Sequence, residues 1–533
     1  MPAPATVEAL FAEATAAHKA GRLDEAEKLY RGLMNFDPVP PGAGHNLGII
    51  LAQRGQVLDA LPLLERAFQA APANGVFAAS YARSLLAAGR PAEAVAILEQ
   101  VKRLGVVAPA LDRLLVQARE QVGGDVRDAD QLYAQATEHH QARRLGRAEA
   151  LYRKAVERNH GHVDAWKNLG SLLAAQGRLE EAITAYRQAL ERVPGDSGML
   201  DDLGCVFTAA GRIMEAIATY RQAVAAAPSF APAHFHLGSL LSEHGDIAEG
   251  FAHFMRRAEL TFANGPAPPQ DDPPPHRIKH DREQGEYLAA RGKIAPGAPS
   301  VPELFHLEDG ARVFGPAVNP SNATAQVIEK WRSTWPQHVV LDDFLTPDAL
   351  ERLRGYCAGS TVWRRNYGAG YIGAAPEDGF CCPLLAQIAE EIRATFPEIL
   401  GQHLFQYLGA FKYDSELSTG TNTHADNAAV NVNFYIAPDE ANLDPSSGGM
   451  DIWDVVVPAG EDMKRYNSNE ALVREFLARS GARKTIIPHR ANRAVIFRSD
   501  HFHKTSDCKF AEGYLNKRIN ISLLFGRHNP ATG

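Results

Sequence analysis

Long apolar runs are missing from this chain of 533 residues. It contains no stretch of 18 consecutive apolar residues, about the length that a membrane-spanning helix needs. Its first residues, "MPAPATVEALFAEA", also lack the basic and the uninterrupted apolar segments of a secretory signal. We therefore expect a cytoplasmic protein with no membrane partner.

An excess of positive charge is missing too. The chain carries 55 Lys and Arg against 63 Asp and Glu, a net charge of -8, with a pI near 6.2. Binding to nucleic acid draws most of its free energy from phosphate contacts by basic side chains. We therefore expect no nucleic-acid partner.

Cysteine is scarce and poorly spaced for cross-linking. The number is odd, two of the residues are adjacent, and no CxxC spacing occurs, which argues against a disulfide framework and a thiolate zinc site. We expect small buried side chains at all five positions. These are Cys205, Cys357, Cys381, Cys382 and Cys508.

The first half of the chain repeats itself. "AGRLDEAEKLYR" recurs in altered form as "GRLEEAITAYRQ" and "GRIMEAIATYRQ", and the turn glycines are 34 residues apart within two series. A fixed period of this length indicates stacked helical units. The two series are Gly21, Gly55 and Gly89, then Gly177, Gly211 and Gly245.

Each unit also has landmarks on both sides of its turn. "NLG" at 46–48 and 168–170, "DLG" at 202–204 and "HLG" at 236–238 supply a small residue where two helices approach, and prolines end the second helix. These features resemble the tetratricopeptide repeat from about Val7 to Phe262. The resemblance implies a curved groove that holds a protein or peptide, or alternatively a brace or a homodimer contact.

The repeat phase breaks once. From Gly89 to its equivalent Arg143 is one repeat plus 20 residues, which predicts a lone helix near Pro109 to Gln121 and a short spacer, "GGDVRDA". We therefore expect one block over 1–122 and a second over 123–262. A proline-rich linker with a connecting segment of unassigned structure follows over 263–337.

Over 338–533 the sequence pattern changes from helical repeats to strand-like runs. Five strand-like runs, in "HLFQYLGAFKYDS", "AVNVNFYIAP", "GGMDIWDVVVP", "ANRAVIFRSD" and "RINISLLFG", predict a β-sandwich or jelly roll. One helix is expected after a cap at Thr346. Another is expected after a capping box of Asn467 and Glu470.

The stretch "THADNAAVNVNFYIAP" carries polar side chains where a buried strand is expected. By strand alternation His424 and Asp426 point together, and Asn431, Asn433 and Tyr435 share one face further on. Buried polar groups need partners, so this face should line a polar pocket. The alternative is an amide-rich strand bonded to a neighbouring loop.

A metal would explain why His424 and Asp426 share a face. Ferrous iron in oxygenases is held by two histidines and one carboxylate, so a second histidine is needed. His489 and His528 have the context of ordinary surface histidines. His501 and His503 can share a face just after "VIFRSD".

Four ordered motifs, "HADN", "SGGMDIWD", "NRAVIFRSDHFH" and "KRINISLLFG", are similar to the 2-oxoglutarate and Fe(II)-dependent dioxygenases of the prolyl-hydroxylase type. The resemblance implies a double-stranded β-helix, or jelly-roll, domain with flanking helices. It points to His503 as the third ligand and makes His501 a neighbour. It implies Fe(II), 2-oxoglutarate and O2 as cofactor and cosubstrates, with ascorbate as a further candidate.

The cosubstrate is a dicarboxylate, whose far carboxylate needs a fixed cation such as a bidentate arginine. The family places a basic residue on the strand after the distal histidine, which matches Arg518; Arg527 lies beyond the strand. Asn520 and Ser522 point the same way as Arg518. The resemblance adds Tyr413 to the cosubstrate site. Two residues of the neighbouring strand are further candidates there, Tyr435 and Asn433.

With Asp426 present, no ligand position is left for a halide, so hydroxylation is expected rather than halogenation. We expect a protein or peptide side chain as substrate, with proline as the candidate that the resemblance suggests, and an entrance shaped by 366–380 and the helix near Glu470. The alternatives are a small-metabolite hydroxylase, a non-catalytic repeat scaffold with a degenerate metal-binding barrel, and a zinc hydrolase.

Overall fold

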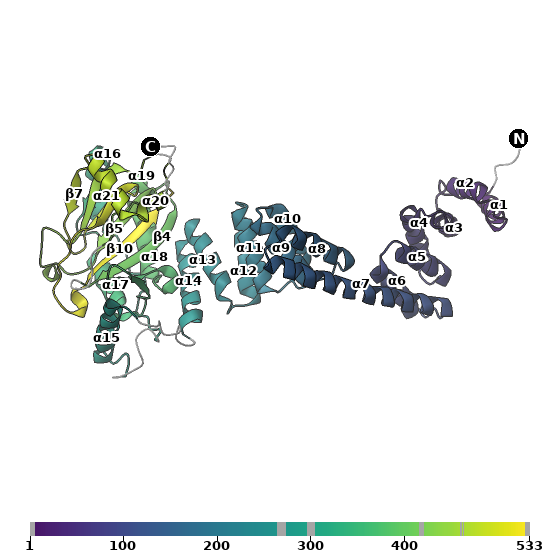
Figure 1. Ribbon diagram of the computed structural model, residues 1–533, viewed down its shortest axis with the longest axis horizontal. Coiled ribbons are helices and arrows are strands. Elements are labelled where there is room, and N and C mark those ends of the chain that lie inside the picture. Colours follow the sequence, from purple (N-terminus) through teal and green to yellow (C-terminus); the bar gives the residue numbers. More distant parts are fainter. Residues whose placement is uncertain are drawn as a thin grey trace. The chain divides into compact units, whose positions relative to one another are not determined.

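The computed structural model describes residues 6–263, 273–295, 304–414, 421–458, 461 and 463–527 (Figure 1). Paired helices occupy its N-terminal part, as the 34-residue period predicts. They are α1 (Val7–Lys19), α2 (Leu23–Leu33), α3 (Pro41–Gln53), α4 (Val57–Ala70), α5 (Gly75–Ala87), α6 (Pro91–Arg103), α7 (Pro109–Gln141), α8 (Leu145–Arg158), α9 (Val163–Ala175), α10 (Leu179–Leu190), α11 (Ser197–Ala209), α12 (Ile213–Ala226), α13 (Ala231–Glu243) and α14 (Ile247–Phe262).

The turn residues take the backbone conformation that the repeat requires. All six periodic glycines have positive φ, and Arg143, their non-glycine equivalent, has φ 56°. The second glycine of the repeat serves a different purpose. A Cβ on Gly204 would lie 2.4 Å from the ring of Tyr220, so only glycine lets α11 approach α12 this closely.

The predicted spacer between the two repeat blocks is wrong. Instead of a lone helix and a spacer, α7 runs without interruption for 33 residues and includes the expected spacer "GGDVRDA". A glycine inside a helix costs only about 1 kcal/mol. The N-terminal half of α7 packs on α5 and α6 and its C-terminal half on α8, and this packing outweighs that cost.

The contacts divide the chain into two compact units, Met1–Arg192 and Val193–Gly533. The division lies inside the predicted second block, because the last helix pair, α13 and α14, packs on the C-terminal domain. Helix α14 contacts α18 (Pro383–Thr395), and Phe251 packs edge-on against Phe405 at 5.7 Å between ring centroids.

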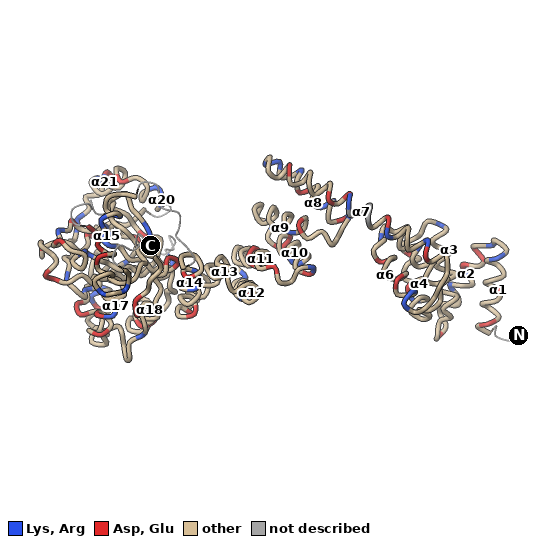
Figure 2. The backbone as a smooth tube through the Cα atoms, turned by 90° about the horizontal axis from the view of Figure 1, so that it is seen from below, with Lys and Arg blue, Asp and Glu red and all other residues tan. Residues whose placement is uncertain are grey.

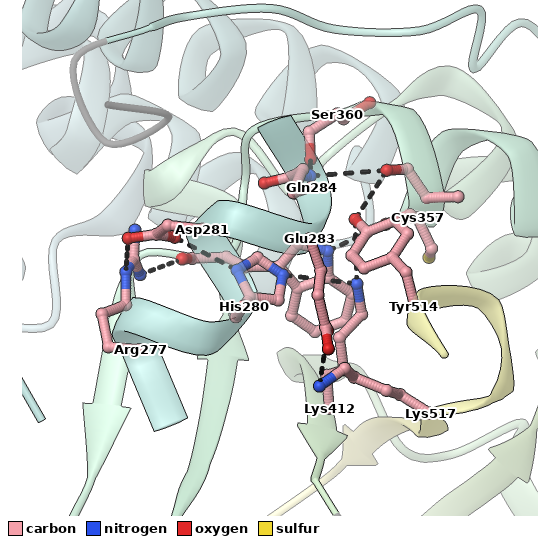
Figure 3. A network of polar contacts seen from close by, with 12 residues as sticks. Arg277, His280, Asp281, Glu283, Gln284, Cys357, Ser360, Lys412, Tyr514 and Lys517 are labelled. Carbon is pink, nitrogen blue, oxygen red and sulfur yellow. Dashed lines mark hydrogen bonds and ion pairs between the residues drawn. The ribbon is translucent and has the colours of Figure 1, made fainter. Parts of the chain in front are cut away.

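The connecting segment contains a helix, α15 (Pro275–Ala290), bound to the C-terminal domain by buried polar contacts (Figure 3). Gln284 donates to the carbonyl of Ser360 at 2.9 Å, and Lys517 lies 2.8 Å from Glu283. Lys412 is enclosed between these elements, and burial lowers its pKa to about 7. Residues 264–272 and 296–303 of the predicted linker lie outside the described residues.

Two antiparallel sheets form the C-terminal domain. The larger has the order β1-β8-β5-β10-β4-β3-β2, and the smaller β7-β6-β9. The strands are β1 (His338–Leu341), β2 (Arg365–Tyr367), β3 (Tyr371–Ala374), β4 (Phe405–Tyr413), β5 (Val430–Tyr435), β6 (Met450–Val456), β7 (Lys484–Ile487), β8 (Ala494–Arg498), β9 (His501–Thr505) and β10 (Arg518–Phe525). All five predicted runs contain a strand.

The two faces of the large sheet differ in chemistry. Ile521 and Leu523 of β10 and Val432 of β5 belong to the main hydrophobic core, together with residues of α17 (Pro347–Gly359) and α18. The alternate residues of the same strands are mainly polar and line a pocket on the opposite face. Strand alternation therefore places one face in the core and the other around the site.

Of four further helices in the described residues, one precedes β1, one lies between β3 and β4, and two lie between β6 and β7. Two, α16 (Ala325–Ser333) and α19 (Pro397–Leu400), contact each other. The other two are α20 (Met463–Asn467) and α21 (Glu470–Arg479). The short 3-10 turns are η2 (Pro320–Asn322), η3 (Pro376–Asp378), η4 (Asp439–Ala441) and η5 (Tyr514–Asn516).

Two predicted caps differ in detail. Thr346 precedes α17, but its hydroxyl donates to the carbonyl of Pro316 at 3.0 Å instead of capping the helix. The predicted capping box of Asn467 and Glu470 is wrong, because Asn469 caps α21 by accepting from the backbone N–H of Leu472. Asn467 is held elsewhere by a tertiary contact.

The expectation of buried cysteines holds for Cys357, Cys381 and Cys382, but Cys205 is exposed and Cys508 half-buried. Within the described residues no helix is both long and apolar enough to cross a membrane. Figure 2 shows Lys and Arg interspersed with Asp and Glu along the helices.

Candidate metal centre

A pocket of about 750 Å³ opens on the polar face of the large sheet. Residues from β4, β5, β9 and β10 line it, together with the segment just before β5 and the turn between β2 and β3. All eight residues predicted for the site lie in its wall. They are Tyr413, His424, Asp426, Asn433, Tyr435, His503, Arg518 and Ser522.

His424, Asp426 and His503 present three ligand atoms to one point. Nε2 of His503 lies 3.4 Å from Oδ2 of Asp426, and Nε2 of His424 lies 4.0 Å from Oδ1 of Asp426. One ligand atom from each residue lies within 4.8 Å of the others. Two imidazoles and one carboxylate form the donor set that holds non-haem Fe(II) in oxygenases.

Backbone pairing fixes the two histidines side by side. The backbone N–H of His424 donates to the carbonyl of His503 at 3.0 Å, and that of His503 donates back at 2.8 Å. Each imidazole then has Nδ1 against a carbonyl oxygen, of Asn422 at 2.8 Å and of His501 at 2.9 Å. Since a carbonyl only accepts, Nδ1 carries the proton and Nε2 is left for a metal.

Asn467, which the sequence analysis placed in a helix cap, instead holds the segment between the first two candidate ligands. Its Oδ1 accepts from the backbone N–H of Ala425 at 3.0 Å, and its Nδ2 donates to the Ala425 carbonyl at 2.7 Å. The backbone of the following residue, Asp426, is also fixed, because its N–H donates to the carbonyl of Ser499. No sequence signal connects Asn467 to Ala425, because they meet only in the folded chain.

The protonation states suit metal binding. Burial lowers the pKa of His424, and the neighbouring His503 lowers it further, so the ring is neutral, which is the form that binds metals. Burial by itself would raise the pKa of Asp426. The hydrogen bond and charge of His503, with smaller contributions from His424 and Asn431, outweigh it and lower that pKa to about 2.

Arg518 brings a buried positive charge to the same pocket. Only 1% of the residue is exposed, and its guanidinium carbon lies 4.7 Å from the ring centre of Tyr413 and 5.2 Å from that of Tyr435. It donates to the carbonyls of Gly448 and Gly449, at 2.6 and 2.9 Å, and to Asn520 at 2.8 Å. Three of its five N–H groups are thus directed at protein oxygens, and two remain for a ligand.

The amides of β5 and β10 line the pocket, as expected for this polar face, but most of their hydrogen bonds are made with protein atoms. Asn431 donates to Oδ2 of Asp426 at 2.7 Å, and Oδ1 of Asn433 accepts from Asn520 at 2.9 Å and Ser522 at 2.8 Å. Asn433 is thus bonded to protein, as in the alternative interpretation, but its partners are on the neighbouring strand β10 and not on a loop.

Two buried polar atoms in this wall have no hydrogen-bond partner among the described residues, Oδ1 of Asn431 and the hydroxyl of Tyr435. Burial raises the pKa of Tyr435 to about 12. The hydroxyl of Tyr413 differs, since it is 3.0 Å from Oγ1 of Thr505. Unpartnered buried polar atoms are rare in folded proteins, so Oδ1 of Asn431 and the hydroxyl of Tyr435 indicate room for a polar ligand.

An aromatic wall, which the sequence analysis did not predict, lies beside the polar groups. Tyr367 and Tyr371 stack at 4.6 Å between ring centroids, Tyr371 stacks on Tyr413 at 4.9 Å, and Phe411 meets both β2–β3 tyrosines edge-on. Tyr367 and Tyr371 belong to the segment 366–380 that was expected to shape the entrance.

The other histidines have structural surroundings. His501 is fully buried, with Nδ1 3.0 Å from the carbonyl of Trp453, and it does not line the pocket. His489 was interpreted as a surface residue, which is wrong. It is buried behind Tyr435, with Nε2 3.2 Å from the Ala437 carbonyl. His528 lies outside the described residues.

Family models of the tetratricopeptide repeat match residues 7–31, 51–118, 133–197 and 202–267. The helix pairs are tetratricopeptide repeats. Such repeats commonly form surfaces that bind other proteins.

Among solved structures, the chain is similar to two forms of MamA at 19% identity and a TM-score of 0.25. One is the MamA RS-1 ArsTM double mutant, where the match covers 36% of this chain and 97% of that chain. The other is MamA from residue 41 to its end, from Desulfovibrio magneticus RS-1, where it covers 38% and 98%. No curated protein matches the chain.

Proposed function

We propose that the C-terminal domain is a 2-oxoglutarate- and Fe(II)-dependent dioxygenase that hydroxylates a side chain of a protein or peptide. One observation carries the proposal. The ligand atoms of His424, Asp426 and His503 lie within 4.8 Å of one another in the same pocket that buried Arg518 lines. A metal site and a carboxylate site in one cavity are what this reaction requires.

The residues fit the iron. Each of His424 and His503 has Nδ1 against a carbonyl oxygen and Nε2 free of carbonyl contacts, and the pKa of Asp426 is lowered to about 2, so two imidazole nitrogens and an ionised carboxylate are available as Fe(II) donors. When bound, iron with 2-oxoglutarate supplies the oxidation of a C–H bond by O2. Asn431 orients the Asp426 carboxylate, and Asn467 fixes the chain between the first two ligands.

The residues also fit a dicarboxylate. The two remaining N–H groups of Arg518 can hold one carboxylate, and the hydroxyl of Tyr435 supplies a further donor that has no partner in the described chain. Gly448 and Gly449 fix the guanidinium by accepting from it, which gives the "SGG" motif a positioning role. The antiparallel large and small sheets on either side of the pocket support a jelly-roll, or double-stranded β-helix, interpretation of the domain.

The repeats favour a macromolecular substrate or partner. A solenoid on the same chain raises the local concentration of a bound peptide near the pocket. The second candidate function is a non-catalytic scaffold, which the repeats alone would serve. The convergence of His424, Asp426 and His503 and the unpartnered polar atoms of the pocket favour the enzyme.

The test is anaerobic addition of Fe(II) and 2-oxoglutarate to the full chain, followed by release of succinate in air. Wild type should give the visible charge-transfer band of a metal-bound 2-oxo acid and then produce succinate. Asp426→Ala should lose both signals. Asp348→Ala, which removes a carboxylate that is 65% exposed on α17, is the matched control and should keep both. If correctly folded wild-type protein gave neither signal, the dioxygenase proposal would be wrong and the non-catalytic scaffold would be the supported function.

A further inference from the structure

A second group of potential ligands lies outside the pocket, on the repeat helices of the C-terminal unit. Asp201 and Cys205 are four residues apart on α11 and therefore share one face of the helix. His236 lies on α13, the first helix of the next repeat, which contacts α11. Repeat stacking thus brings a carboxylate, a thiol and an imidazole together.

The distances suit a common ion. Nδ1 of His236 lies 2.8 Å from Oδ1 of Asp201 and 3.9 Å from Sγ of Cys205, and all three ligand atoms are within 4.8 Å of one another. Donors at tetrahedral angles around zinc, with bonds of about 2.0 to 2.3 Å, are roughly 3.3 to 3.6 Å apart. The two measured separations lie on either side of that range, so small side-chain rotations suffice.

The other repeats fill the equivalent position differently. In two earlier repeats an asparagine stands sixteen residues after a buried tyrosine and donates to it, Asn46 to Tyr30 at 2.9 Å and Asn168 to Tyr152 at 3.4 Å. His236 occupies this position after Tyr220. There the tyrosine ring stacks on the imidazole, and its hydroxyl donates to Sγ of Cys205 at 3.3 Å.

We propose that Asp201, Cys205 and His236 bind a Zn2+ ion that links α11 to α13. A thiolate among the donors excludes Mg2+ and Ca2+, and one sulfur, one nitrogen and one oxygen are ligands that zinc accepts together. Cys205 is at the surface, so water can take the fourth position. Tyr220 is a positioning residue, because its hydroxyl donates a hydrogen bond to Sγ of Cys205.

The site is tested with Co2+ as the spectroscopic probe on the full-length chain. Co2+ bound to a thiolate gives a near-ultraviolet charge-transfer band, which the sulfur-free barrel site cannot produce. Wild type should show the band at one equivalent per chain, and Zn2+ should abolish it. Cys205→Ser should lose the band, whereas Cys508→Ser, the matched control, should keep it.

Two more variants separate loss of the zinc site from misfolding and from loss of the candidate iron site. His236→Asn introduces the residue that two other repeats carry at this position. It should weaken Co2+ binding by at least about 10-fold, as loss of even an outer-shell partner does. Asp426→Ala should leave the band unchanged, so this proposal does not depend on the dioxygenase activity. Absence of the band in wild type, or its persistence in Cys205→Ser, would overturn the zinc site.

Discussion

Asn467 binds both backbone groups of Ala425, the residue between the two candidate ligands His424 and Asp426. The contact joins the end of α20 to the segment that carries these two candidate ligands. Replacing Asn467 by Ala should weaken anaerobic Fe(II) binding by about 10- to 100-fold, the usual cost of losing an outer-shell partner. Isothermal titration of Fe(II) under nitrogen measures this.

The control for that variant is the neighbouring Asn469→Ala. It removes the cap of α21 and should cost about 1 kcal/mol of stability, but it should leave the iron affinity unchanged. Equal iron affinities for the two variants would show that Asn467 does not position the ligands.

Arg518→Ala should weaken 2-oxoglutarate binding roughly 100- to 1000-fold or more, because removing a buried charge partner costs about 3 to 5 kcal/mol. Arg518→Lys should be intermediate, since lysine keeps the charge without the planar fork. Arg527→Ala serves as the control, because its side chain is 77% exposed beyond the strand. Unchanged 2-oxoglutarate affinity in Arg518→Ala would assign the cosubstrate to another cation.

The docking of α15 depends on Lys517, which lies 2.8 Å from Glu283 and also pairs with Asp414 (Figure 3). Its side chain is only 7% exposed. Lys517→Met should destabilise the C-terminal unit by about 3 to 5 kcal/mol, because it leaves buried carboxylates without this partner. Urea unfolding followed by tryptophan fluorescence measures this difference.

Lys504→Met provides the comparison. Lys504 pairs at 3.8 Å with Asp507, whose side chain is 99% exposed, and such surface pairs contribute about 0 to 1 kcal/mol. Similar losses in the two variants would mean that the α15 network is no more stabilising than a surface pair.

Stability should fall in mild acid because of His489. Burial, aided by the charge of Arg518, lowers the pKa of His489 to about 4 from the ordinary 6.5. The unfolded chain therefore binds more protons below pH 6.5, so this contribution is present above that pH and is lost as the pH falls toward 4. At pH 5 the loss is roughly 2 kcal/mol.

The corresponding measurement is the free energy of urea unfolding from pH 7.5 to pH 5 for wild type and His489→Gln. The variant should be less stable at pH 7.5 but should lose about 2 kcal/mol less on acidification. Parallel curves for the two proteins would exclude His489 as the source.

The sequence by itself determined the elements whose signals are local or periodic. The 34-residue recurrence of glycine predicts helix pairs, and all six glycines have the positive φ that this turn requires. Strand alternation in "VNVNFY" predicted which side chains share the pocket face, since successive residues of a strand point to opposite sides. The resemblance of ordered motifs then selected His503 from four histidines.

Tertiary structure decided what local signals leave open. Packing at both ends of α7 outweighed the helix-breaking tendency of its glycines, so the predicted spacer became helix. His489 looked like a surface residue because its cover, Tyr435 and Phe510, comes from strands and loops distant in the chain. Asparagine is a residue type typical of helix caps, yet Asn467 binds the backbone of Ala425, 42 residues away in the chain. A side chain's partner across such a distance is fixed by the fold, because only the packing of whole elements brings the two groups together.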